Sequence, residues 1–487
     1  IVQMAKDAIG VIYEMDHWGC PFSRYEDGRI TQRPFGGAGF PRTCYGADKT
    51  GHYLLHTLVE QAYKHQVKLY VEQYVCKLIV HDGVCQGVVA YDMIRGGFEA
   101  FTGGAVIIAT GGAGRIYANS TNALINTGGG MALAYHAGVP LKDMEFIQFH
   151  PTGLYSTNIL MTEAARGEGG YLLNGLGERY MERYAPKFME LAPRDIVARA
   201  GQTEINEGRG INGQPYVYLD LRHLGAEKIL ERLPGIRDLA IHFEGVDPIE
   251  EPIPVVPSQH YTMGGIDTNV DGATPLPGLY AAGECACVSV HGANRLGGNS
   301  LLETIVFGRR AGAEVARYLE GRSDRRPPNA RSAFAAVQAM EDKVDALART
   351  EGGEDAYALR TEMAQVTKEY FGVFRDESTM KAGLERLLSI KERSAKVGLR
   401  YTGSVFNLDL IRTLDLESMI DVALCMAFGA VNRTESRGAH YRTDYNTRDD
   451  ANWLKHTLAY YRPGEAGPRL DYKPVTLGYF EPQERKY

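Results

Sequence analysis

The stretch His291-Gly-Ala-Asn-Arg-Leu-Gly-Gly-Asn-Ser-Leu-Leu302 carries the strongest structural signal in the chain. It follows a strand-like apolar run, Gly278–Glu284, and leads into an apolar helical pattern that reaches Val315. Its small residues let a planar ring approach the backbone, and the helix start offers free N–H groups and positive potential. Arg295 supplies the two-pronged guanidinium that suits a carboxylate. We therefore predict a site for an anion held beside a cofactor.

Two further glycine-containing segments are typical of cofactor binding. Ala109-Thr-Gly-Gly-Ala-Gly114 follows an apolar run, which predicts a strand-to-loop turn whose backbone a dinucleotide can touch. At the end of the run Gly278–Glu284, the carboxylate of Glu284 is placed either to bind sugar hydroxyls or to cap a helix. Each turn alone is equally consistent with an ordinary strand connection. Together with the helix start Asn299-Ser-Leu301 they predict a flavin site.

Ionisable residues gather between residues 148 and 195. In Gln148-Phe-His-Pro-Thr-Gly153, His150 precedes a proline and is expected in extended chain, where a lone histidine is most often structural. Glu163 and Arg166 are three residues apart and would meet on one helical turn, as a surface ion pair or as part of a site. Arg194 begins another helix, where a cation opposes the helix dipole. Because a positive charge at this position destabilises the helix, we infer that Arg194 has a functional role.

The order of apolar patterns predicts a discontinuous α/β fold. Residues 146–258 differ in composition and are interpreted as an insertion that ends in a proline-rich hinge, Glu251–Pro257, before His260 in Gln259-His-Tyr-Thr-Met-Gly-Gly265. We predict helices over residues 1–17, 53–64 and much of 328–395, the last with the apolar series Phe334, Val337, Met340 and Val344. We predict strands at 69–80, 87–91, 105–109 (buried), 264–270 and 279–282.

The bulk composition is that of an ordinary globular protein. Of 487 residues 44% are hydrophobic and 23% charged, and the length implies several domains. A net charge of -7 argues against nucleic acid as a binding partner. No apolar run in the sequence is long enough to span a bilayer. Seven scattered cysteines favour a reducing compartment. The pair Cys285-Ala-Cys287 is better explained by small buried residues than by a zinc site, so no metal is expected.

Taken in order, these motifs resemble the flavoprotein subunit of succinate dehydrogenase and fumarate reductase (respiratory complex II). The resemblance runs from near residue 10 to Tyr487. It includes Arg-Pro-Phe-Gly-Gly, Arg-Thr-Cys-Tyr-Gly-Ala-Asp-Lys-Thr-Gly-His and, at 435–441, Glu-Ser-Arg-Gly-Ala-His-Tyr. It implies a Rossmann-like FAD-binding domain (1–145 and 259–322) with an inserted α+β capping domain (146–258), a helical domain (323–400) and a C-terminal domain (401–487).

The resemblance also implies roles for individual residues. His150 and Thr162 would hold one carboxylate of succinate or fumarate, and His260 and Arg295 the other. Hydride would pass between substrate and FAD N5, with Arg194 as proton donor or acceptor and Glu163 and Arg166 as its relay. An arginine acid is surprising at its ordinary pKa, so it requires close positioning and prompt proton exchange. The residues implied to contact FAD are Thr110, Gly111, Gly112, Gly129, Glu284, Asn299, Ser300 and Leu301.

Partners and location follow from the same resemblance. Electrons would leave to an iron–sulfur subunit and then to quinone at membrane anchor subunits, because this chain has no cysteine cluster of its own for such a centre. The protein is therefore expected at the membrane periphery, on the cytoplasmic or mitochondrial matrix face. Succinate oxidation and fumarate reduction are both consistent with these residues.

The sequence departs from the family in two places. The N-terminal Gly-x-Gly-x-x-Gly unit and the histidine that carries FAD covalently in many members are absent, and Ile1 opens in the middle of a helical pattern, so we expect the beginning of the protein to be missing. Covalent attachment would need a histidine outside these 487 residues. Gly129 stands where members usually carry an aspartate beside the flavin, which removes a hydrogen-bond partner.

Two rival interpretations remain open at this point. L-aspartate oxidase belongs to the same superfamily, and Leu191-Ala-Pro-Arg-Asp-Ile-Val-Ala-Arg-Ala200 would suit that enzyme, whereas Asn432–Tyr445 and the terminal residues 480–487 favour complex II. A chain without the dinucleotide unit is alternatively a non-catalytic assembly fragment. Flavin absorbance together with succinate-dependent dye reduction distinguishes these possibilities.

Overall fold

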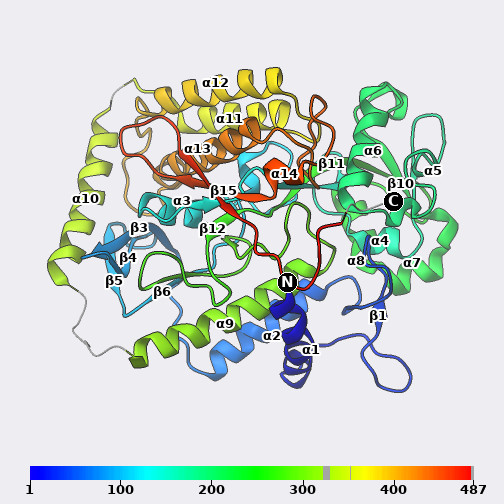
Figure 1. Cartoon of the computed structure of the whole chain (residues 1–487), viewed down its shortest axis with the longest axis horizontal. Coiled ribbons are helices and arrows are strands. Elements are labelled where there is room, and N and C mark those ends of the chain that lie inside the picture. The colour runs from blue at the N-terminus through cyan, green and yellow to red at the C-terminus, as the bar shows by residue number, and fades with distance from the viewer. Residues whose placement is uncertain (322–328, 351, 484–487) are drawn as a thin grey trace.

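Strands and helices are mixed throughout this computed structural model, which describes residues 1–321, 329–350 and 352–483. Helices surround the central sheets on three sides, and a separate body of strands and short helices, α4 to α8, lies at the right in Figure 1. The helices lie at α1 Val2–His17, α2 Thr50–Lys64, α3 Gly129–His136, α4 Glu163–Gly167, α5 Met181–Tyr184, α6 Arg194–Asn206, α7 Ala226–Arg232, α8 Pro234–Glu244, α9 Asn299–Gly321, α10 Ala330–Arg349, α11 Ala356–Tyr370, α12 Glu377–Ser394, α13 Leu408–Asn432 and α14 Asp450–Trp453.

Two sheets bear on the functional site. The antiparallel sheet β8-β11-β10-β9 consists of Ile147–Leu154, Ile253–Thr262, Val217–Asp220 and Tyr171–Leu173. The mixed sheet β14-β12-β7-β15-β16 consists of Ala286–Cys287, Gly265–Asp267, Leu141–Lys142, Lys455–Tyr460 and Arg469–Pro474. The chain passes between the two sheets twice through short connections, from β7 to β8 and from β11 to β12.

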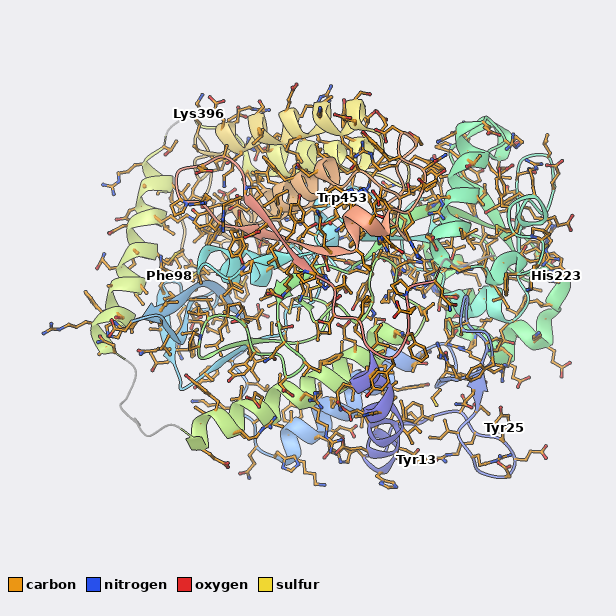
Figure 2. All side chains as sticks on the ribbon, in the orientation of Figure 1. Tyr13, Tyr25, Phe98, His223, Lys396 and Trp453 are labelled. Carbon is orange, nitrogen blue, oxygen red and sulfur yellow. The ribbon has the colours of Figure 1, made fainter. Side chains whose placement is uncertain are left out.

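The smaller sheets complete the strand content. The antiparallel sheet β3-β4-β5 spans Gln73–His81, Val84–Asp92 and Phe98–Thr102 and packs on α10; Figure 2 labels Phe98 at this junction. The pair β13-β6, Leu279–Ala281 and Val106–Ile108, is parallel, and the pair β1-β2, Gln32–Arg33 and Thr43–Cys44, is antiparallel. The main core forms around α13, which is buried along most of its length between α3, α11 and α12.

Four local expectations need correction. The strand predicted from residue 69 begins at Gln73, because Glu72 adopts a left-handed φ of 56° that ends the extended chain. The strand predicted as buried at 105–109 is only partly so: Ile107 is 41% exposed, since among the described residues β6 pairs on one edge only. The proline-rich segment Glu251–Pro257 is not a hinge, because most of it belongs to β11.

The fourth correction concerns α10. Phe334 is 70% exposed, whereas Ala333, Ala336 and Met340 are buried against the β3-β4-β5 sheet, with Val337 packed beside them. The small alanine side chains allow α10 to approach the sheet closely. Because the gap between them is narrow, the larger side chain of Phe334 faces away from the sheet.

The predicted division into five segments stays a prediction. The boundary at residue 258 lies inside β11, so this strand continues across it, and the boundary at 322/323 lies outside the described residues. The same holds for the last residues of the polar tail, 484–487.

Candidate functional site

Strands β8 and β11 pair side by side and bring two histidines together. His150 lies opposite Ser258, but the register shifts between Gln259 and Tyr261, so His260 is the extra residue of a β-bulge. A bulge re-aims one side chain, which is why bulges are common beside active sites. The centroids of the His150 and His260 rings are 5.0 Å apart in an edge-on arrangement.

Short helix α4 presents Glu163 and Arg166 inward. Their exposed fractions are 1% and 2%, which excludes the alternative of an ordinary surface pair. Thr162 is the N-cap, and its hydroxyl accepts from the Ala164 N–H at 3.4 Å. Arg166 donates to the Glu190 carbonyl, while its Nε and Nη2 have no hydrogen-bond partner. Unsatisfied buried guanidinium nitrogens of this kind indicate a site for an additional acceptor.

Arg194 begins α6 after Pro193, as its place in the sequence predicts. Its guanidinium donates from Nε to Glu163 Oε2 at 2.8 Å, and Nη2 lies 2.7 Å from the same oxygen. Nη1 donates to Gln148 Oε1 at 3.2 Å. The carboxylate of Glu163 also accepts from the Gly36 N–H at 2.5 Å. The arginine is therefore fixed in orientation between a carboxylate and a neutral amide.

Arg295 approaches the same amide from the other side. Its Nη2 donates to Gln148 Oε1 at 3.1 Å and its Nη1 to Ser300 Oγ at 3.2 Å, at the start of α9. The guanidinium carbon lies 4.3 Å from the centroid of the Tyr261 ring, within the range of a cation–π contact. Its Nε is buried without a partner. Arg295 is thus held from three sides and still has a donor free.

Burial sets the protonation states of this cluster. Burial, reinforced by Arg194, holds the pKa of His150 and of His260 well below the ordinary histidine value, so both rings are neutral. Burial and then Arg194 lower the pKa of Arg295 to about 10. Burial alone would raise the pKa of Glu163, but Arg194 and Arg166 keep it below its ordinary value. Glu163 is therefore an ionised carboxylate among buried cations.

Buried neutral histidines make the stability of the protein depend on pH. A third ring, His440, accepts from Arg375 Nη1 at 2.8 Å, and burial and then Arg375 hold its pKa well below the ordinary value. The unfolded chain binds protons on all three rings below about pH 6.5, whereas the folded chain does not, so stability falls as pH falls. We expect a loss of about 4 kcal/mol between about pH 7.5 and about pH 5.5, on top of the carboxylate contributions.

Urea unfolding at several pH values measures this dependence. Replacing the structural ring, His440→Gln, should reduce the histidine part of the slope by about a third. The exposed-site replacement His242→Asn is the matched control and should leave the slope unchanged. A stability that stays flat across this interval in the unaltered protein would rule out the neutral-ring assignment.

The glycine turn and Glu284 fit closely together. A Cβ at Gly112 would lie 2.2 Å from Glu284 Oε1, and Gly111 has a left-handed φ of 70°. Glu284 does not cap a helix: its Oε1 accepts from the Thr262 N–H at 3.0 Å, and burial raises its pKa to about 7. Gly129 begins α3, and a Cβ there would meet only Thr127 Oγ1, at 3.6 Å, so the space of a larger side chain is open.

One cavity of about 2310 Å³ extends from Arg194 and His260 to the start of α9. Its volume exceeds that of an ordinary small-molecule pocket, as a dinucleotide requires. Trp453, labelled in Figure 2, lies at another part of its wall. The predicted site residues in its lining are Thr162, Arg194, His260, Arg295, Asn299, Ser300 and Leu301. Those outside its lining are His150, Glu163, Arg166, Thr110, Gly111, Gly112, Gly129 and Glu284.

Two observations test whether these residues suit FAD. The start of α9 provides backbone N–H groups at the cavity wall, and the buried Nδ1 of His291 and Oγ1 of Thr262 have no partner. Helix N-terminal N–H groups favour an anionic partner, and unpaired buried polar atoms call for a polar ligand. The residues present therefore fit the flavin that the motifs predict.

Several residues of the site were missed in the sequence. Gln148 and Asn294 lie inside quoted motifs but carry no charge, so nothing in the pattern marked them. Tyr261 donates to Glu303 at 2.5 Å, and His291 pairs with the same oxygen at 2.6 Å. Only the pairing of distant segments reveals this network beneath Arg295.

The described part of the chain offers neither a cluster of metal ligands nor a membrane-spanning helix. Among the described residues no group of histidine, cysteine and acidic side chains could hold a metal ion. Within residues 1–321, 329–350 and 352–483, no helix has a stretch both long and apolar enough to pass through a bilayer.

Comparison with known proteins identifies the class. A family model described as FAD binding domain matches residues 1–301, and one described as Fumarate reductase flavoprotein C-term matches residues 360–487. Together with the site, these matches define an FAD-dependent oxidoreductase.

The fumarate reductase flavoprotein subunit of Proteus vulgaris is 46% identical over 97% of this chain and 81% of its own length. The succinate dehydrogenase flavoprotein subunit of Rickettsia bellii is 44% identical over 98% and 82%. The chain belongs to the family of fumarate reductase and succinate dehydrogenase flavoprotein subunits.

Solved structures agree with this assignment. A variant of E. coli quinol fumarate reductase FrdA superposes with a TM-score of 0.95 at 42% identity, over 99% of this chain and 84% of that one. Mycobacterium smegmatis Sdh1 in complex with UQ1 gives a TM-score of 0.83 at 37% identity, over 98% and 81%. The predicted family, the α/β fold and FAD as cofactor are thereby confirmed.

Proposed function

We propose that this chain is a catalytic subunit that interconverts succinate and fumarate, with Arg194 as the proton donor in one direction and acceptor in the other. The observation that carries the proposal is the position of Arg194. It lines the same cavity as the start of α9 and is held between Glu163 and Gln148, with Arg295 on the far side of that amide. FAD, when bound, supplies the two-electron redox chemistry, held by Glu284, Asn299–Leu301, the Thr110–Gly112 turn and Gly129.

Opposite donors would bind the two carboxylates. The Thr152 amide, which can only donate, lies 3.3 Å from His150 Nδ1, so the other nitrogen, Nε2, carries the hydrogen. That Nε2 is buried without a partner and would donate to one carboxylate, together with the hydroxyl of Thr162 in the cavity lining. His260 and Arg295 would hold the other carboxylate. Two fixed ends keep a C4 dianion from rotating, which orients its central carbons toward Arg194.

The charge of the site suits a dianion. Three guanidinium groups, those of Arg166, Arg194 and Arg295, surround a single carboxylate, that of Glu163, while the two histidine rings are neutral. Glu190, whose carbonyl accepts from Arg166, is already paired with Arg179 through two hydrogen bonds of 2.8 and 2.6 Å. Glu284 also interacts with Arg295, but burial raises its pKa to about 7, so it is mainly protonated at lower pH. Under those conditions two positive charges remain, which match the two negative charges of the substrate.

The proton path follows from the contacts of Arg194. In fumarate reduction a proton would leave the guanidinium of Arg194 for a substrate carbon. Glu163, an ionised carboxylate hydrogen-bonded to Arg194, would accept a proton from Arg166 and pass it on to Arg194, and Arg166 would regain its proton from solvent. Burial lowers the pKa of Arg166, Glu163 opposes this shift and Arg194 adds to it; the net lowering favours this arginine as the next member of the relay. Near-complete burial of all three groups keeps bulk water away from the hydrogen bond between Arg194 and Glu163. Arg166 is bonded to the Glu190 carbonyl, and its partner-free Nε and Nη2 would be the donors for the next step of the relay.

We further propose the partners that the family uses. The structural relatives include E. coli quinol fumarate reductase FrdA and Mycobacterium smegmatis Sdh1 in complex with UQ1. By analogy, electrons would pass from this chain to an iron–sulfur subunit and then to quinone at membrane anchor subunits. The chain would then lie at the membrane periphery through those subunits, on the cytoplasmic or matrix face.

A direct assay tests the proposal. The purified full chain, incubated with FAD and then freed of unbound cofactor, should retain visible flavin absorbance and show succinate-dependent reduction of an artificial dye and fumarate-dependent oxidation of a reduced dye. Oxidation of L-aspartate in place of succinate would favour the aspartate oxidase alternative. Absence of both flavin and turnover would favour the assembly fragment.

A further inference from the structure

Gln148 contacts both catalytic-site arginines through one neutral oxygen. Its Oε1 accepts from Arg194 Nη1 at 3.2 Å and from Arg295 Nη2 at 3.1 Å, and the side chain is fully buried. A carboxylate is the ordinary partner for two converging guanidinium groups inside a protein. An uncharged amide at this point therefore calls for an explanation.

The orientation of the amide is fixed by a chain of contacts that starts at a carboxylate. Asp195 Oδ1 can only accept, so the Asn294 side chain must donate to it with Nδ2, at 2.7 Å. This places Asn294 Oδ1 toward Gln148, whose Nε2 donates to it at 2.7 Å and to the Arg295 carbonyl at 2.7 Å. The remaining atom, Oε1, must then face the two arginines.

We propose that Gln148 is a positioning residue that aligns Arg194 and Arg295 without neutralising either, and that it thereby sets the preference of the site for dianions. The inference rests on the proposed dicarboxylate function. Gln148 explains why the buried cluster keeps two surplus positive charges. Its amide accepts from two guanidinium N–H groups but contributes no negative charge that would neutralise them. Asp195 supplies the anchor, and its own charge is balanced by Arg199, 3.0 Å away.

Gln148→Glu and Gln148→Met form a matched pair, because both lose the two hydrogen bonds that Nε2 donates to Asn294 and to the Arg295 carbonyl, and only the first adds a negative charge. Gln148→Glu keeps the shape and the acceptor toward the arginines and removes one of the two surplus charges. We expect the dissociation constant of a dicarboxylate such as malonate, read from the change in flavin absorbance, to rise at least about 100-fold, about 2.7 kcal/mol. A monoanion such as propionate should lose only about tenfold, so discrimination between the two falls about tenfold.

Gln148→Met removes the hydrogen bonds and leaves the charge. Here we expect turnover to fall about tenfold through misalignment of Arg194, with the ratio of dianion to monoanion affinity unchanged. If Gln148→Glu weakens both anions by the same factor, or weakens neither, the charge-sparing role is wrong.

A second variant secures the test if Gln148→Glu does not fold. Asn294→Ala alters no charge but frees the amide to turn its Nε2 toward the arginines, and it should weaken dianion binding about fivefold to tenfold. Unchanged affinity in this variant would overturn the orienting chain. Failure of the proposed function would look different, because the unaltered holoenzyme would then show no dicarboxylate-dependent change in flavin absorbance.

Discussion

Replacing Arg194 by lysine or glutamine is expected to lower succinate–fumarate turnover at least about a thousandfold while dicarboxylate binding stays largely intact. Arg194 donates to Glu163 at 2.8 Å and to Gln148 at 3.2 Å. A shorter or neutral side chain cannot hold a transferable proton between the substrate carbon and the carboxylate of Glu163. The carboxylates themselves would be held by other residues. Turnover with dye, and the dicarboxylate dissociation constant from flavin absorbance, measure the two effects separately.

The matched control, Arg222, lies in the helical turn that follows β10. Arg222 pairs with Asp220 at the protein surface, so Arg222→Gln should leave turnover and binding unchanged. Full activity in Arg194→Lys would remove Arg194 from proton transfer. An equal loss of binding and turnover would instead assign it to the carboxylate clamp.

Arg295→Gln is expected to weaken dicarboxylate binding about a hundredfold or more, because it removes one of the two surplus positive charges and a buried donor to the substrate. It also removes the contact with the Tyr261 ring and the hydrogen bond to Ser300. Arg295→Lys keeps the charge but not the planar fork, so we expect only a partial recovery of affinity. The KM for succinate and the dissociation constant of malonate should rise together.

Arg310→Gln, further along α9, is the control for this position. Arg310 forms partly exposed ion pairs with Asp7 and Asp271, so its loss should leave the KM unchanged. Unfolding in urea shows whether each variant is folded under the assay conditions. A normal KM in folded Arg295→Gln would exclude Arg295 from the substrate clamp.

Local rules were enough to locate the helix starts that matter. Arg194 and Asn299 each begin a helix where capping and turn patterns predict one, and His150 lies in extended chain before its proline. These features depend on a few neighbouring residues, so the sequence determines them. The buried amphipathic pattern of α10 was less reliable, because Phe334 and Ala333 compete for the inward face and only the sheet beneath decides between them.

The chemical identity of the site also came from the sequence, since several motifs in one order are specific to one family, and the comparisons confirm that family. The structure alone decided how these motifs work together. Glu163 meets Arg194 across 31 residues, Gln148 meets Arg295 across 147, and a register shift in β11 turns His260 toward His150. Such contacts depend on how distant strands pair, and local composition does not specify strand register. For that reason only the folded structure shows that the neutral amide of Gln148 contacts both arginines and preserves the two surplus positive charges.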